Sequence, residues 1–282
     1  AYESLLRRRR CAIHEAVLRA LETQHEGRLE EHVALLAHHA FAAELWSEAV
    51  QHFRAAGVKA SASSAYREAV AHLDQALVAL EHTPASVQRS ALGIEIRLDL
   101  RPALGANAEY EGLLTRLEEA RVLARTIGDE LREVHFAADS VHVLYHIGRI
   151  ESALTTGEEA VRAAQALGDP RTLLLARANY SQAHYFAGDF ERARQSGLPL
   201  EEELRTTFRH ARIGTTCTSS CLWLGNLCGV HATVGEFDKA IEVGQEACLI
   251  AAETGLPIDQ VMSGNWLAWC HALRGDGAAV LE

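Results

Sequence analysis

Apolar side chains recur every three or four positions along most of this chain. In residues 66–82, for instance, Ala69, Leu73, Ala76 and Leu80 follow this spacing. A period near 3.6 places such residues on one face of a helix. β-Branched residues are scattered rather than alternating, and the hydrophobic fraction of 48% is ample for a core. The pattern predicts an all-α fold with no competing strand.

Glycine and proline interrupt this spacing at intervals and delimit the expected helices. Gly27 and Pro84 close two of them, and Gly168-Asp169-Pro170 joins two others, with glycine past one helix end and proline at the start of the next. The expected helices are 2–23, 31–44, 47–63, 66–82, 85–104, 110–127, 130–147, 150–167, 171–186, 190–206, 210–234, 237–254 and 258–273. Their short connections make consecutive helices antiparallel neighbours.

One turn recurs in the second half of the chain. It combines a glycine, a polar residue, an apolar anchor and, five residues after the glycine, an alanine. The glycines are Gly148, Gly188, Gly235 and Gly275, at intervals of 40, 47 and 40 residues; the anchors are Ile150, Phe190 and Phe237, and the alanines are Ala153, Ala193 and Ala240. A unit that recurs at an interval of roughly 20 to 50 residues is typical of a repeat array.

The residues before each turn resemble a known repeat. Tyr180 with Ser181, Leu227 with Cys228, and Leu267 with Ala268 occupy a large apolar and a small position, and His184, His231 and His271 follow at an aromatic position. Together with the glycine turn and the alanine, this resembles the tetratricopeptide repeat (TPR), in a longer form than usual and with histidine replacing the aromatic residue. The resemblance implies an all-α, TPR-like right-handed superhelix (α-solenoid) of antiparallel helix pairs, with an incomplete last repeat.

A second resemblance covers residues 2–82. It rests on residues 2–10 (YESLLRRRR), 13–14 (IH), 36–39 (LAHH), 55–57 (AAG) and 68–69 (EA). These segments look like the region that follows the ATPase in bacterial multidomain signalling proteins, which also carry an adenylate or guanylate cyclase or a DNA-binding output domain. The resemblance implies that residues 1–30 form a linking helix from a preceding domain and that residues 31–282 form the repeat array.

Charge and cysteine content narrow the expected partners and compartment. The 282 residues carry a formal net charge of −11, which argues against nucleic-acid binding by this segment. Because the sequence has no apolar run of about 18 residues and no signal peptide, we expect a cytoplasmic protein without a membrane partner. Six cysteines without CxxC pairs are expected to be buried, reduced thiols. The four arginines at 7–10 form either a solvated face or domain junction, or a contact for phosphates or an acidic partner.

Catalytic signatures are absent from the sequence. Without a GxxxxGK[ST], HExxH or GxSxG motif, we expect no catalytic residues, no cofactor and no enzyme activity in this segment; the ATP chemistry that the resemblance implies belongs to the attached ATPase. His135, His142 and His146 share one helix face, but only the last two have the i, i+4 spacing that lets two rings reach one metal ion. No further ligand has matching spacing, so we interpret them as groove lining rather than as a metal site.

The TPR resemblance also implies where a partner binds, because the first helix of each pair in such arrays lines a concave groove. Counting back from the turn glycines gives the candidate residues His135, His142, Tyr145, His146, Gln182, Tyr185, Phe186, Asn265 and Trp269. Aromatic and histidine side chains suit the capture of a protein or peptide partner, since they offer contact area at low entropic cost. The alternative is that these side chains pack only against neighbouring helices.

The expected function is a non-catalytic module for protein–protein interaction or signal sensing. A ligand that prefers one curvature of the array would bias an attached ATPase and its cyclase or transcription-output domain. Two alternatives remain open at this point: a sensor domain that binds a small effector, and a structural scaffold that associates with itself.

Overall fold

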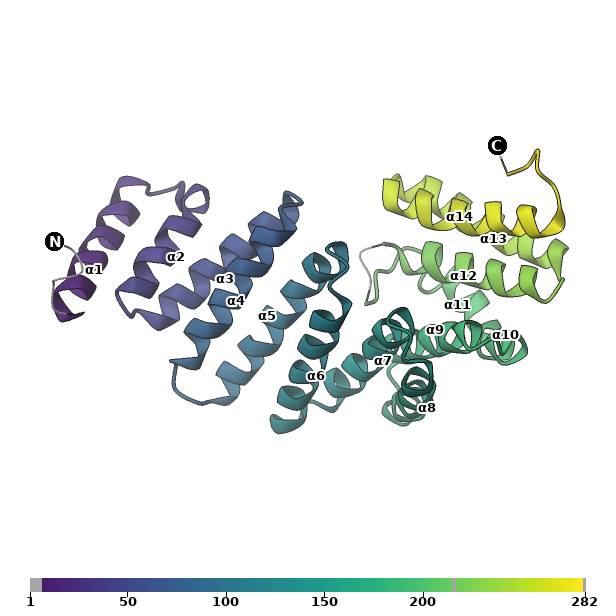
Figure 1. Ribbon diagram of the computed structural model, residues 1–282, viewed down its shortest axis with the longest axis horizontal. Helices are drawn as coiled ribbons and strands as arrows, with labels where there is room; N and C mark the ends of the chain where they lie inside the picture. The colour runs from purple at the N-terminus through teal and green to yellow at the C-terminus, as the bar shows by residue number, and fades with distance from the viewer. Residues whose placement is uncertain (1–6, 215–216, 281–282) are drawn as a thin grey trace. The chain divides into compact units, whose positions relative to one another are not determined.

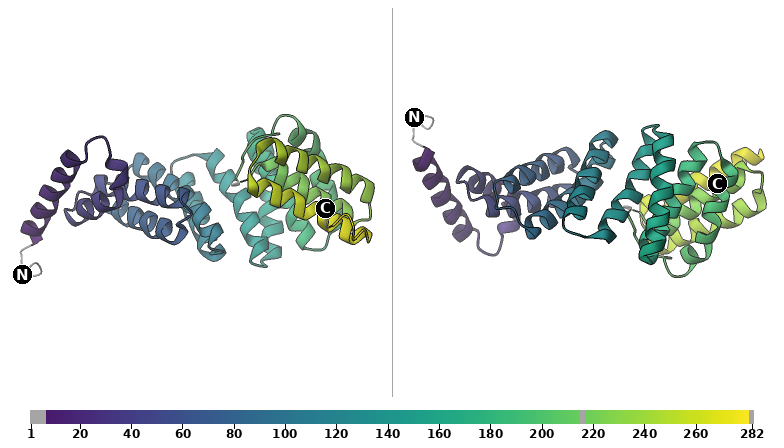
Figure 2. Two further views of the ribbon diagram at one scale, coloured as in Figure 1. Left: turned by 90° about the horizontal axis from the view of Figure 1, so that it is seen from above. Right: turned by 90° about the horizontal axis from the view of Figure 1, so that it is seen from below.

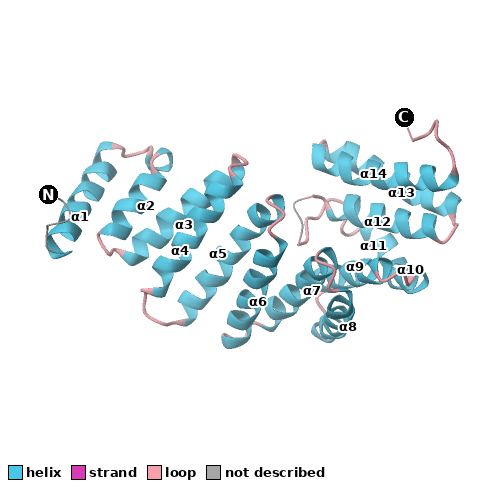
Figure 3. Cartoon of the chain, viewed as in Figure 1, coloured by secondary structure: helices cyan, strands magenta, loops and turns pink. Residues whose placement is uncertain are grey.

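The computed structural model describes residues 7–214 and 217–280, in which helices are joined by turns and loops without any strand (Figures 1 and 3). The part of the first expected helix at residues 2–6 lies outside these ranges. Contacts divide the chain into two compact units, Ala1–Glu130 and Leu131–Glu282, which we call the first and the second unit. The expected domain boundary at residue 30 stays a prediction.

The first unit stacks its helices in chain order. They are α1 (Arg7–Gln24), the 3₁₀ helix η2 (Leu29–Glu31), α2 (Val33–Ala42), α3 (Trp46–Ala62), α4 (Tyr66–Glu81), α5 (Val87–Ala106) and α6 (Tyr110–Thr126). Each α-helix from α1 to α5 packs on the one that follows it. The close approach of α3 and α4 depends on Gly57, where an added Cβ would lie 2.5 Å from Leu73 Cγ. Apolar faces of the kind predicted from the sequence therefore meet between successive helices.

The second unit also consists of helices that pack on one another. Its helices are α7 (Glu130–His146), α8 (Ile150–Leu167), α9 (Pro170–Phe186), α10 (Phe190–Gly197), the 3₁₀ helix η3 (Leu198–Leu200), α11 (Glu201–Arg205), α12 (Ser219–Thr233), α13 (Phe237–Thr254) and α14 (Pro257–Arg274). α9 packs on α8 and α10, and α12 packs on α13 and α14. Figure 2 shows α13 and α14, in yellow-green and yellow, beside α12 in both views.

The same backbone turn ends helices in both units. At Gly188 the backbone takes a left-handed conformation (φ 78°), and the next N–H, that of Asp189, donates a hydrogen bond of 3.0 Å to the His184 carbonyl. This geometry satisfies carbonyls that a helix end leaves without partners. In the first unit the left-handed position is held by Glu44 (φ 59°), Ser64 (φ 61°) and Ala108 (φ 56°). The recurring turn thus serves to end a helix, whether or not its left-handed residue is glycine.

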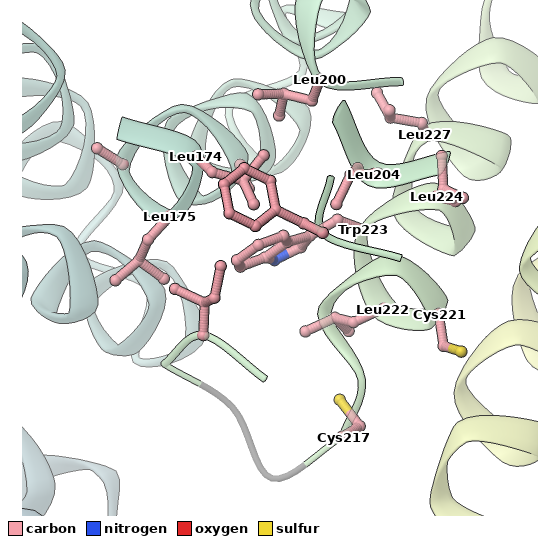
Figure 4. Close-up of a cluster of buried hydrophobic side chains, with 14 of the residues drawn as sticks. Leu174, Leu175, Leu200, Leu204, Cys217, Cys221, Leu222, Trp223, Leu224 and Leu227 are labelled. Carbon is pink, nitrogen blue, oxygen red and sulfur yellow. The ribbon is translucent and has the colours of Figure 1, made fainter. Parts of the chain in front are cut away.

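Helix α12 is the centre of the second unit's core. Every one of its residues from Ser219 to Ala232 is buried. Leu174 of α9, Leu200 and Leu204 of the η3–α11 segment, and Trp223 of α12 belong to one cluster of buried apolar side chains (Figure 4). A helix that is enclosed on all sides needs no polar face, which explains why α12 shows hardly any amphipathic pattern.

The expected helix at 210–234 is wrong at its start, because α12 begins only at Ser219. Hydroxyl groups hold the preceding segment in turns instead. Ser220 Oγ donates to the Leu204 carbonyl at 2.7 Å, and Ser219 Oγ accepts from the Ile213 N–H at 2.9 Å. Serine and threonine side chains that bond to nearby backbone offer the chain an alternative to helix, and this stretch is rich in both.

The expected helix at 190–206 is also interrupted. Pro199 lies in η3, which separates α10 from α11. Proline has no N–H to donate and its ring clashes with the preceding turn, so a continuous α-helix is not formed there. The interruption turns α11 toward α12, on which it packs.

A buried carboxylate fixes the start of α12 to α14. Asp259, fully buried in the first turn of α14, accepts hydrogen bonds from the Thr218 N–H (2.8 Å), from Thr218 Oγ1 (2.7 Å) and from Thr254 Oγ1 (2.8 Å). A buried charge is tolerated when hydrogen bonds replace its hydration. This contact sets where α14 lies against α12.

Candidate functional site

The candidate site begins on the last turns of α7. His142 Nδ1 lies 2.7 Å from Tyr145 Oη, and His146 Nδ1 lies 2.8 Å from the His142 carbonyl, to which it donates. The two imidazole ring centroids are 4.4 Å apart. Tyr145 is buried, whereas His146 is exposed. The hydrogen bonds hold these rings in one orientation, so α7 presents an ordered edge to solvent.

Aromatic residues at the end of α9 extend this edge. Phe186 stacks on Tyr145 with ring centroids 4.9 Å apart and an interplanar angle of 17°. Phe186 keeps 48% of its surface exposed. Tyr185 contacts Phe186 edge-on at 5.7 Å and Phe190 of α10 at 5.5 Å. Stacked and edge-to-face rings stabilise one another beyond the area they bury, and the exposed face of Phe186 is thereby fixed.

Trp266 of α14 joins the same group. Its ring centroid lies 5.9 Å from that of Tyr185, with an interplanar angle of 85°. The indole lies over Gly225 and Gly229 of α12, since a Cβ added at Gly229 would be 2.4 Å from it and one at Gly225 would be 3.0 Å from it. The two glycines on α12 therefore make room for the indole. Along α12 the surface is filled by Trp266 rather than left open.

We call His142, Tyr145, His146, Tyr185, Phe186 and Trp266 the aromatic face. The first five were predicted from the sequence, and the structure brings them together. Of the other predicted residues, His135 lies further back on α7 and contacts Phe136, Gln182 is buried within α9, and Asn265 and Trp269 are exposed on α14. Whether these side chains bind a partner stays a prediction.

Sequence reasoning missed Trp266 and Phe190 as members or neighbours of this group. A signal for Trp266 was present: Gly225 and Gly229 stand at i, i+4 in a helix without other helix breakers. Such spacing places two small residues on one face, which accepts a bulky side chain from a neighbouring helix.

The histidines at the aromatic position of the repeat are in different environments. His184 is buried against Tyr180, and burial lowers its pKa. His231 is buried between two carboxylates, with Nε2 3.2 Å from Glu201 and Nδ1 2.6 Å from Glu236. Burial opposes protonation of His231, but the two carboxylates outweigh it and raise the pKa. These residues support packing between helices and lie outside the aromatic face.

Other candidate chemistry is weaker. Cys217, Cys221, Cys228 and Cys270 are buried, and burial raises the pKa of Cys221 to about 12. A thiol with so high a pKa is a poor nucleophile and metal ligand at neutral pH. In the first unit a pocket of about 260 Å³ opens between α4, α5 and α6, with two arginine side chains and an apolar floor among its lining. Of the four cysteines, Cys228 lies next to the aromatic face, because its Sγ is 3.6 Å from the Trp266 carbonyl oxygen.

Comparison with known proteins shows which solved structures have a similar fold. No protein-family model matches the sequence, and no curated protein matches it. Among solved structures, the Rap conjugation gene regulator of the plasmid pLS20, in complex with the Phr* peptide, is similar over 86% of this chain and 62% of its own, with a TM-score of 0.64 and 14% identity. This chain therefore spans less than two thirds of that protein's length.

Two further structures are similar. A Rap protein complexed with competence and sporulation factor aligns over 99% of this chain and 87% of its own, at 15% identity and a TM-score of 0.59. A signal transduction ATPase with numerous domains (STAND) and a tetratricopeptide repeat sensor, from Pyrococcus horikoshii, aligns over 95% of this chain and 42% of its own, at 15% identity and a TM-score of 0.55.

These similarities define a class of protein. The chain is an all-α helical repeat protein with a TPR-like α-solenoid fold, as the sequence pattern predicted. In the described part of the chain, no helix combines the length and the apolarity that crossing a membrane requires. At identities this low, the likeness concerns the fold, and function has to be argued from the side chains.

Proposed function

We propose that the aromatic face captures a peptide segment of a protein partner. The observation that carries the proposal is the fixed Tyr145–Phe186 stack, which leaves 48% of Phe186 exposed beside the exposed His146. Rigid aromatic side chains lose little entropy on binding and dominate the energy of many interfaces. Imidazole edges next to them supply polar contacts for a peptide backbone.

Trp269 on α14 extends the proposed surface. Its side chain is 47% exposed and was predicted to face a partner. Tryptophan is among the residues enriched at the centres of protein interfaces. The fold relatives favour a peptide over a small molecule, because two of them were solved with a bound peptide or factor.

The proposal is tested with a peptide obtained by display selection against the whole chain. Isothermal titration of that peptide into the Phe186→Ala variant should show affinity reduced about 10- to 30-fold, the loss typical of an interface anchor. Leu249→Ala is the control, because Leu249 is 54% exposed on α13 and outside the aromatic face. Equal affinities for wild type and Phe186→Ala would show that the aromatic face is not the binding surface.

We further propose that binding regulates an attached ATPase and its cyclase or transcription-output domain. The support is the resemblance of residues 2–82 to the segment after the ATPase in bacterial signalling proteins, together with the TPR sensor of the STAND relative. Binding that favours one arrangement of the helices would shift the population of the attached domains. The gene region upstream of the Ala1 codon tests this directly, since the proposal requires a P-loop there.

A further inference from the structure

Imidazole rings form part of the contact between helices α1 and α2. Only His14 and Leu18 of α1 are buried. The His14 ring lies against His38 and His39 of α2, with centroid distances of 5.8 and 5.1 Å, and the latter two rings are 5.3 Å from each other. We call these three residues the histidine cluster. Three imidazole rings at one helix–helix contact are unusual, because histidine is buried less often than aliphatic side chains.

Two ring nitrogens of this cluster, one from His14 and one from His39, are close enough to share one ion. His14 Nδ1 and His39 Nδ1 are 2.9 Å apart. Two imidazole nitrogens bound to one tetrahedral Zn²⁺, each at about 2.0–2.1 Å, lie roughly 3.3 Å from each other. A separation increase of less than about 0.5 Å therefore converts the observed pair into two metal ligands.

We propose that His14 and His39, together with His38, bind a divalent transition-metal ion such as Zn²⁺ or Ni²⁺, which fastens α1 to α2. His38 is exposed, so its ring is able to turn toward the pair without displacing packed neighbours. Three imidazoles with a water in the fourth position form a common zinc coordination sphere. Imidazole also suits nickel and copper, so the ligand set defines the class of ion rather than one element.

The protonation state of the rings favours metal binding as well. Burial and the neighbouring histidines lower the pKa of His14 and of His39 below that of a free imidazole. Both rings are accordingly neutral at pH 7, which is the state that binds a metal. Burial and the neighbouring histidines make protonation of the cluster unfavourable. A bound metal ion keeps the rings unprotonated.

A second group in the first unit brings three potential metal-ligand atoms close together, but two of its three residues are carboxylates. Glu22, Glu48 and His52 place one ligand atom each within 4.8 Å of one another. Arg19 already neutralises both carboxylates, at 2.9 Å from Glu22 and 2.7 Å from Glu48. A cation would have to displace the guanidinium there, whereas at the histidine cluster it would replace the hydrogen bond between His14 Nδ1 and His39 Nδ1.

The test is calorimetric titration of ZnCl₂ into the chelator-treated full chain. We expect one site whose affinity falls about 10- to 100-fold in His39→Gln and in His14→Gln, the loss expected when a coordination sphere is damaged. Replacement of Zn²⁺ by Co²⁺ should give visible absorption bands of nitrogen coordination in the wild type that are lost in the variants.

Two controls distinguish this site from binding by other histidines. The first control is His25→Gln. The His25 ring follows α1 and lies against the His32 ring, which precedes α2, with centroids 3.8 Å apart. The second control is His142→Gln, which removes one member of the i, i+4 histidine pair on α7. Both should leave the affinity within about twofold of wild type.

His38→Ala, at an exposed position, keeps the proposal testable if the buried substitutions unfold α1. Hydrogen exchange in α1 should slow with Zn²⁺ in the wild type but not in His38→Ala. Unchanged zinc affinity in His38→Ala and His39→Gln, or equal losses in the controls, would overturn the assignment.

Discussion

Residues at the turns decide how readily each helix pair closes. Gly148, Gly188, Gly235 and Gly275 hold the left-handed position in the second unit, whereas Glu44, Ser64 and Ala108 hold it in the first. A side chain at positive φ brings Cβ close to the carbonyl and costs about 1–2 kcal/mol. The glycine that marked the repeat in the sequence is therefore replaced at three turns of the first unit, although Gly128 keeps it at the end of that unit, which is why the repeat was harder to recognise there.

Exchanging these residues should change stability in opposite directions. We expect Ala108→Gly to raise the free energy of unfolding by about 0.5–1 kcal/mol, because relief of the strained φ exceeds the added entropy of glycine in the unfolded chain. Gly148→Ala should lower it by about 1 kcal/mol, since nothing within 4 Å blocks the new Cβ and only the φ of 76° opposes it. Urea unfolding followed by circular dichroism measures both. A loss of stability in Ala108→Gly would contradict the explanation.

At the scale of elements, the fit of α14 on α12 depends on Gly225 and Gly229, of which Gly229 lies closer to Trp266. The Trp266 ring occupies the space that a side chain at Gly229 would need. Gly229→Ala should lower the free energy of unfolding by about 1–3 kcal/mol, because the added methyl group overpacks the contact. Chemical denaturation of the variant measures the loss.

A second substitution separates this steric effect from helix propensity. In the Trp266→Leu background, Gly229→Ala should lose much less, which a double-mutant cycle detects as a coupling energy. Gly264→Ala on α14 is the matched control: no atom lies within 4 Å of its added Cβ, so helix propensity alone should raise stability by up to about 1 kcal/mol. Additive effects of Gly229→Ala and Trp266→Leu would contradict the proposed contact.

Helices with one apolar face and short turns were predictable from the sequence, because spacing alone specifies them. Residues 150–167 and 237–254 were expected as helices, and α8 and α13 have these bounds. The start of α12 was not predictable, since the apolar character of a fully enclosed helix has no periodicity and the hydrogen bonds of Ser219 and Ser220 form only in the folded chain.

The candidate site was predictable to a similar degree. Counting from Gly148 and Gly188 identified Tyr145 and Phe186, which stack on each other. Trp266 was not predicted, because its position depends on the distance between α14 and α12. That distance is set by side-chain packing, which cannot be read from a single sequence.

For the molecule as a whole, buried histidines make stability depend on pH in two directions. The lowered pKa values of His14, His39 and His184 give stability that is present above the unfolded pKa of about 6.5 and is lost as pH falls. His231 acts in the opposite sense. Its raised pKa gives stability that is complete below about pH 6.5 and is lost as pH rises through the folded value.

The contribution of His231 is separable by substitution. We expect His231→Gln to lose more stability at pH 6 than at pH 9, because the protonated ring bonded to Glu201 and Glu236 is present only in the wild type at the lower pH. Urea unfolding at the two pH values measures the difference. His210→Gln, at a largely exposed position near Glu253, should show almost none. A deficit that grows with pH would reverse the assigned sign.

The complete enclosure of α12 has a consequence for how the second unit folds. In most repeat arrays each unit touches only its nearest neighbours, so unfolding can start at an end and proceed unit by unit. Here α12 touches α9, α10, α11, α13 and α14. Removing any of these exposes apolar surface on a helix that has no polar side. The second unit should therefore unfold in a single cooperative transition, as a globular domain does, although its sequence has the pattern of a repeat array.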